Sequence, residues 1–177
     1  MNVPPSLLPG LLTEYGLARS YSVELIEALD HDQIVWRPHD DSSAILWHLG
    51  HQAAVNHYLV RNLTAAEPTI NRSFDALFDS ATPERERGGL PPLEAVLDYR
   101  RRVGVSTAAI VDRIQRGEVG APGQLAVIAA GLLRAVINHE YQHAAWMAEV
   151  RSGLTGVPEP RPRSERLELI EGYHVLA

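Results

Sequence analysis

The chain has 177 residues, a formal net charge of −6 and no cysteine. This length suits one domain of roughly 100–200 residues with a sizeable core. The acidic balance, without a run of lysine or arginine, speaks against nucleic acid as the main partner, because phosphate backbones need a basic surface. Without cysteine there is no disulfide, thiolate metal site or cysteine nucleophile, so any metal must be held by histidine, aspartate or glutamate.

The start of the chain, Met1–Gly10, has neither a basic stretch nor a long apolar one, and so does not resemble a signal peptide. No window approaches the roughly 18 consecutive apolar residues that a membrane-spanning helix needs. We therefore expect a cytoplasmic protein without a membrane partner.

Glycine and proline residues divide the chain into four long segments in which apolar residues recur with a spacing near 3.6. The predicted helices span about residues 6–29, 43–63, 92–116 and 123–153. Asp41, Ser42 and Ser43 offer an N-cap to the second helix, and Pro91 and Pro92 suit the first turn of the third. No segment alternates as a strand does, so the sequence predicts an all-α protein.

The connection over residues 64–90 is long and contains a possible short helix around 74–78. Such a connection between the second and third helices favours a four-helix bundle with a crossover, and it could form a lid or a pocket wall. We expect residues 1–155 to form the bundle. Residues 156–177 would be a C-terminal extension that packs on the bundle or on a partner chain.

Three histidines face inward when the helices are projected at about 100° per residue. His139 and His143 lie on the apolar stripe of the fourth helix, and His51 lies on that of the second. Buried imidazoles need partners, and a shared metal ion is an efficient one. Three histidine ligands would leave a coordination position open, as catalytic sites do. The alternative is that these histidines are hydrogen-bonded core residues without a metal.

Other residues near these three are weaker candidates. His48 is either a rival ligand, a residue that supports a ligand, or a half-buried packing residue. Glu140, Asn56 and Tyr58 are further candidates for supporting the ligands from outside. Five aromatic residues are expected in the core, namely Trp36, Trp47, Trp146, Tyr15 and Tyr58. Surface or loop positions are expected for His31, His39, His57 and His174, and a solvated helix face for Arg100, Arg101 and Arg102.

The motifs that carry these residues resemble the DinB/YfiT-like superfamily. Its opening signature is similar to Trp36-Arg37-Pro38, Ser42-Ser43-Ala44-Ile45 and Leu46-Trp47-His48-Leu49-Gly50-His51. Its closing signature is similar to His139-Glu140-Tyr141-Gln142-His143, followed by Glu149-Val150-Arg151 and Leu154. The two signatures stand in the family's order, and the resemblance covers nearly the whole chain.

The resemblance implies a four-helix bundle with a long crossover, frequent dimers, and one divalent metal ion on His51, His139 and His143. Zinc, nickel and iron all occur in the family. Its characterised members include S-transferases that use mycothiol or bacillithiol, maleylpyruvate isomerases, and a domain of sulfoxide synthases. Two departures are Ala144-Ala145, where many members have Gly-Gln, and Asn56, where an acidic residue is frequent.

Our leading expectation is a metal-dependent transferase that joins a low-molecular-weight thiol to a small-molecule substrate, in a protein that forms a homodimer. A coordinating thiol loses its proton, which would make it a nucleophile. No catalytic base can be named from the sequence. One alternative is a metal-dependent hydrolase with Glu140 as the base. The other is a non-catalytic metal-binding or interaction protein.

Overall fold

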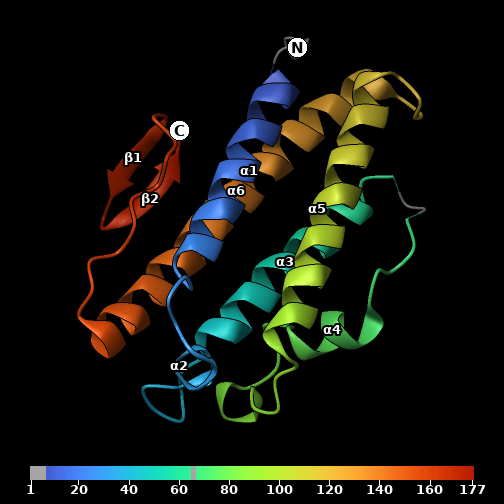
Figure 1. Ribbon diagram of the computed structural model, residues 1–177. Coiled ribbons are helices and arrows are strands. Elements are labelled where there is room, and N and C mark those ends of the chain that lie inside the picture. Colours follow the sequence, from blue (N-terminus) through green and yellow to red (C-terminus); the bar gives the residue numbers. More distant parts are fainter. Residues whose placement is uncertain (1–6, 65–66) are drawn as a thin grey trace.

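The computed structural model describes residues 7–64 and 67–177, and four long helices dominate it (Figure 1). The long helices are α1 (Leu7–Glu24), α3 (Ile45–Arg61), α5 (Leu93–Gln115) and α6 (Pro122–Thr155). Three short ones are α2 (His31–Val35), α4 (Arg72–Leu77) and the 3-10 helix η1 (Glu84–Glu86). The predicted all-α fold is confirmed. Residue 6, where we expected the first helix to begin, and the first six residues of the expected 1–155 domain lie outside the described residues.

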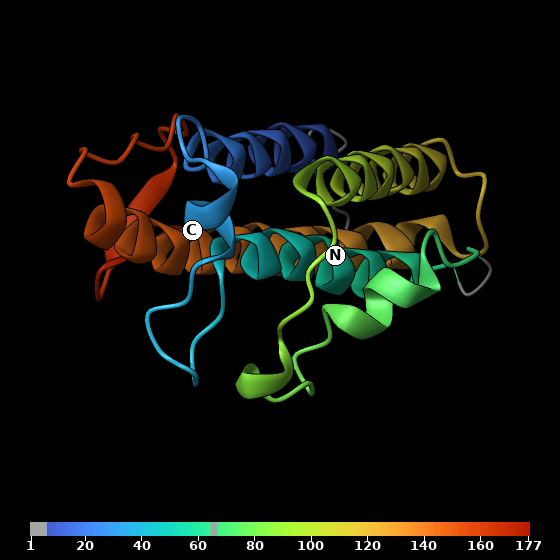
Figure 2. The same ribbon diagram turned by 60° about the horizontal axis from the view of Figure 1, so that its bottom comes forward.

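The long helices form two layers (Figure 2), with α1 and α5 in one layer and α3 and α6 in the other. The closest packing joins α1 to α6 and α3 to α5, and α3 also packs along α6. The core between the layers is apolar, and its largest fully buried side chains include Leu11, Leu25, Trp47, Tyr99, Leu133 and Tyr141. This packing fixes α3 against α6, the two helices that carry the three histidines.

Local signals explain where the elements begin and end. Asp30 caps α2 in a capping box with Gln33, and Asn71 caps α4 through the Phe74 N–H. Pro92 directly precedes α5, and Gly156 ends α6 in the left-handed conformation that glycine adopts easily. The first helix is shorter than predicted, because the chain turns after Glu24.

The crossover between α3 and α5 runs back along α3 and packs on it at two points. Phe78, just after α4, is fully buried, and Arg87, just after η1, is 7% exposed. The predicted short helix around residues 74–78 is the six-residue α4. The crossover therefore covers one side of α3, which becomes important for His51.

The C-terminal extension contains a β-hairpin, which the sequence analysis did not identify. Strand β1 (Leu167–Ile170) pairs antiparallel with β2 (Tyr173–Leu176) across a two-residue turn in which Glu171 and Gly172 have positive φ. Each strand has four residues, too few for a clear alternating pattern. Strand β2 packs on α6, where the Asn138 side chain bonds the backbone N–H and C=O of the buried Leu176.

No helix within residues 7–64 and 67–177 combines the length and the apolar character needed to cross a membrane.

Candidate metal centre

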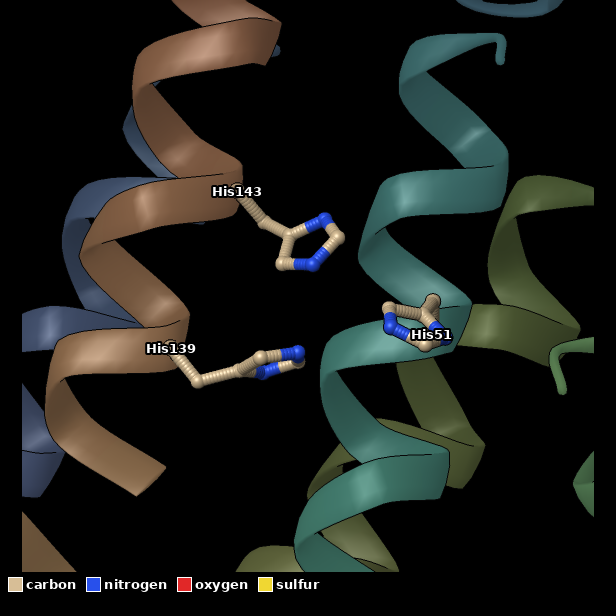
Figure 3. Close-up of side chains that lie close together, drawn as sticks. All are labelled: His51, His139 and His143. Carbon is tan, nitrogen blue, oxygen red and sulfur yellow. The ribbon is translucent and has the colours of Figure 1, made fainter. Parts of the chain in front are cut away.

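The structure brings the three predicted ligands together. His51 reaches from α3 and His139 and His143 reach from α6 into the space between these helices (Figure 3). One ring nitrogen of each lies within 4.8 Å of those of the other two. His51 and His143 are buried and His139 is half-buried. Residues more than 80 positions apart in the chain therefore form one compact cluster of nitrogen donors.

The cluster lies at the edge of the core, because the buried face of α6 is centred near Glu140 and Ala144 rather than on His139. Glu140 follows His139 directly and therefore points about 100° away from it around the helix axis. The buried stripe is thus displaced from the line through His139 that the projection indicated. Ile128, which is 11 residues before His139 and so lies close to that line, is 51% exposed. On α3 the shift is similar, and Tyr58, expected in the core with His51, is 63% exposed. A site at the edge has access to solvent that a central site would lack.

The crossover orients His51 through the backbone of Phe78. His51 Nδ1 lies 2.7 Å from the Phe78 carbonyl oxygen, so it carries the proton and donates it to that oxygen. The other nitrogen, Nε2, is then unprotonated and free to bind a metal. A carbonyl behind a histidine is the usual way in which proteins fix the tautomer and direction of a metal ligand.

A stack of three side chains also holds His51. Its ring lies against the Trp47 indole, with ring centres 4.5 Å apart and an angle of 12° between the planes. The Arg87 guanidinium also lies over the Trp47 ring, with its central carbon 3.8 Å from the ring centre. Arg87 is fixed in turn by donating to Ser43 Oγ and to the Thr82 carbonyl oxygen. No sequence pattern pointed to Arg87, since it lies in a segment without periodicity.

Gly50 makes room for this arrangement. A Cβ atom at position 50 would lie 2.3 Å from the Phe78 ring, which is far inside van der Waals contact. We therefore expect Gly50→Ala to displace Phe78 and its carbonyl from His51. Overpacking of this kind costs about 1–3 kcal/mol of folding free energy. We expect a lower urea midpoint and a weaker metal affinity in a titration. Gly131→Ala is the matched control, because a Cβ atom at that position would meet no neighbour. Unchanged metal affinity in Gly50→Ala would contradict the role of Phe78.

His48 forms a hydrogen bond with one of the three predicted ligands, His143. The two Nδ1 atoms are 2.9 Å apart, so one ring donates its proton and the other accepts it. With His143 as the donor, its Nε2 is unprotonated and available for a metal, and His48 is the acceptor. His48 is 8% exposed. Of the roles left open by the sequence, this geometry favours support of a ligand.

Burial keeps these imidazoles neutral. The pKa of His48 is lowered to about 3 and that of His139 to about 4, and desolvation is the largest cause in both. It also lowers the pKa of His51 and His143, and neighbouring histidines lower that of His143 further. Neutral imidazole is the form that binds metal, so the cluster is ready to bind an ion at neutral pH.

The same shifts predict how the metal-free protein responds to acid. The ordinary pKa of histidine is about 6.5. Below this pH the histidines of the unfolded chain bind protons, whereas the buried histidines of the folded chain stay neutral. The free energy of unfolding therefore has its full histidine contribution above about pH 6.5. This contribution is lost as the pH falls toward about 4, the pKa of His139 in the folded chain. Urea midpoints at about pH 7 and pH 5 would measure the loss. We expect His143→Gln to reduce the loss, and His31→Gln, at an exposed position, to leave it unchanged.

Glu140 faces away from the cluster into the core. Its Oε2 lies 3.1 Å from Arg100 Nη2, and these side chains are 1% and 3% exposed. Ser22 also donates to this carboxylate. Glu140 is therefore committed to a buried ion pair and is not placed to act as a base beside the histidines. The expectation that Arg100 belongs to a solvated face was wrong, although Arg101 and Arg102 are exposed.

The remaining candidates also lie elsewhere. Asn56 is fully buried and donates to Tyr15 Oη, on the side of α3 that faces the core. His57, expected at the surface, is 3% exposed and lies 3.8 Å from the Asp75 carboxylate. Trp36, expected in the core, is 42% exposed. The positions of Asn56, His57 and Tyr58 show that one helical projection does not separate the core side of α3 from the side under the crossover.

The cluster fits a divalent transition metal. A metal–imidazole bond of about 2.0–2.1 Å puts ligand nitrogens about 3–4 Å apart, so small side-chain movements would bring the three within reach of one ion. Imidazole donors suit zinc, nickel and iron alike. In the described part of the chain, the cluster consists of these three residues. The protein could thus hold one ion and leave coordination positions for water or substrate.

Comparison with known proteins agrees with this geometry. The family model of the DinB superfamily matches residues 14–147, a span that contains His51, His139 and His143. No curated protein matches the chain. The matched span covers well over half of the sequence and runs from α1 to the last third of α6. The chain belongs to the DinB superfamily.

Proposed function

We propose that this protein is a metal-dependent transferase that joins a low-molecular-weight thiol to an electrophilic small molecule, and that it works as a homodimer. The observation that carries the proposal is the cluster of three neutral imidazoles at the edge of the core, which would fill three positions around one ion. A divalent metal ion bound there would favour the thiolate form of a thiol. The dimer and the thiol come from the family resemblance.

The chain's own residues orient and shield this centre. Phe78 and Trp47 fix the direction of His51, and His48 fixes the tautomer of His143. In the proposed transfer, the sulfur–carbon bond forms as the bond to the leaving group breaks, and the leaving group departs with the electron pair. The thiol proton passes to solvent. The half-buried His139 marks the side on which solvent reaches the cluster.

A thiol-conjugation assay tests the proposal. Protein loaded with zinc, nickel or iron would be mixed with an electrophilic chromophore and with each of several bacterial thiols. We expect thiol-dependent turnover that His143→Ala abolishes and that His31→Ala, at an exposed position, retains. Elemental analysis of freshly purified protein would identify the metal. Metal-loaded protein without turnover for any thiol would reject the transferase and leave a non-catalytic metal-binding protein.

A further inference from the structure

A buried polar cluster lies behind the three histidines and joins the four long helices. Gln52 of this cluster directly follows His51 in the chain, and Glu140 directly follows His139. The cluster therefore lies at the same level of the bundle as the predicted metal ligands. Each helix contributes one member, and all are at most 2% exposed: Ser22 on α1, Gln52 on α3, Arg100 on α5 and Glu140 on α6.

Gln52 makes a direct bond between the two helices that carry the histidines. Its Nε2 donates to the main-chain carbonyl oxygen of Glu140 at 2.8 Å and to Ser22 Oγ at 2.9 Å. Its Oε1 accepts from Arg100 Nη1 at 2.8 Å. Both sides of the amide therefore have partners. A side chain next to one ligand is thus bonded to the backbone next to another.

Arg100 fixes the orientation of this amide. A guanidinium can only donate, so Gln52 must turn its oxygen toward Arg100 and its NH2 group toward α6 and α1. The opposite orientation would place two donors against each other on one side and two oxygens on the other. Arg100 is held in turn by the Leu49 carbonyl oxygen and the Glu140 carboxylate. The bond from Gln52 to α6 therefore depends on Arg100.

Metal binding needs a spacing of helices that apolar packing alone does not fix. Three imidazoles share an ion only when their nitrogens are about 3–4 Å apart. Apolar contacts have no preferred direction, whereas a hydrogen bond restricts both distance and angle. A buried ion pair such as that of Arg100 and Glu140 is weak evidence for stability, since apolar residues often replace one without loss. Its place behind the ligands is better explained by the geometry it imposes.

We propose that Gln52, oriented by Arg100, is a positioning residue that sets the distance between α3 and α6 and so holds the three histidines ready for one metal ion (Figure 3). This inference rests on the metal dependence of the proposed function and not on its thiol chemistry. The bond between His48 and His143 crosses between the same two helices about one turn further along. It therefore reports their spacing without a metal.

Replacing Gln52 with methionine removes the amide but keeps a similar side-chain volume. We expect the metal affinity, measured by competition with a chromophoric chelator, to fall about tenfold. Circular dichroism would first show that the metal-free variant is folded, because the affinity of a fully folded protein does not depend on its stability. Thr107→Val is the matched control, since it also removes a buried polar group, and one that bonds the Val103 carbonyl oxygen within α5. Its affinity should stay near that of wild type.

The ring N–H protons of the metal-free protein, observed by NMR, give a second measurement. The proton between His48 and His143 spans α3 and α6, whereas the Nδ1 proton of His51 is bonded to Phe78 in the crossover. In Gln52→Met we expect the first proton to exchange with solvent severalfold faster and the second to keep its wild-type rate. Equal changes in both would show a general loosening of the core and overturn the proposal. If the protein bound no metal, the proposed function would fail, and these two protons would decide the role of Gln52.

The variant Arg100→Met/Glu140→Leu keeps the test decisive if Gln52→Met does not fold. It removes both buried charges together, so the core should keep most of its stability. Gln52 loses the donor that orients it, so we expect a severalfold loss of metal affinity and faster exchange of the proton between His48 and His143. Wild-type affinity in a folded Gln52→Met, or in the double variant where Gln52→Met does not fold, would overturn the proposal. An equal loss in Thr107→Val would do the same.

Discussion

Replacing Arg100 with methionine is expected to lower the free energy of unfolding by about 3–5 kcal/mol. Arg100 donates to the Leu49 carbonyl oxygen and to Gln52 Oε1, each at 2.8 Å, as well as to Glu140. Methionine preserves much of the apolar contact but leaves the Glu140 carboxylate buried without its counter-charge. The cost of an uncompensated buried charge exceeds that of any lost surface contact.

Urea unfolding of two further variants separates this explanation from a loss of packing. Arg101→Met removes a neighbouring arginine whose side chain is 67% exposed and pairs with Asp98, so its effect should stay within about 0.5 kcal/mol. The double variant Arg100→Met/Glu140→Leu removes both charges and should recover most of the lost stability. A double variant as unstable as Arg100→Met would show that the ion pair is not the cause.

Replacing His143 with alanine is expected to weaken metal binding by more than about 100-fold, because a direct ligand is lost. His48→Ala should weaken it less, by about 10–100-fold, since His48 only supports His143. Competition with a chromophoric chelator would measure both affinities, and His31→Ala, at an exposed position, is the control. If His48→Ala abolished binding while His51→Ala retained it, the ligand from α3 would have been misassigned.

The sequence predicted the architecture well, because its signals are local. Glycine, proline and capping residues mark the ends of the helices, and the spacing of apolar residues identifies each one. The spacing of His139 and His143 and the motif around His51 were enough to predict the cluster. The short hairpin escaped notice, because the signal of two four-residue strands with few buried residues is weak.

The sequence could not show that a helix is buried on more than one side. A projection finds the most apolar face, but α3 is buried on two sides, by the bundle and by the crossover. Arg100 and Glu140 occur 40 positions apart, and nothing in either segment indicates that they pair. His57 and Arg87 were missed for the same reason, since their burial depends on contacts between the crossover and α3.

The stack of Arg87, Trp47 and His51 gives the protein an intrinsic optical reporter. A buried indole in contact with both a guanidinium and an imidazole lies in an asymmetric environment, so Trp47 should dominate the near-ultraviolet circular dichroism. The more exposed Trp36 should contribute little. Occupation of His51 by an ion changes the charge on one face of this chromophore. Loading and removal of the metal can therefore be followed in unlabelled protein.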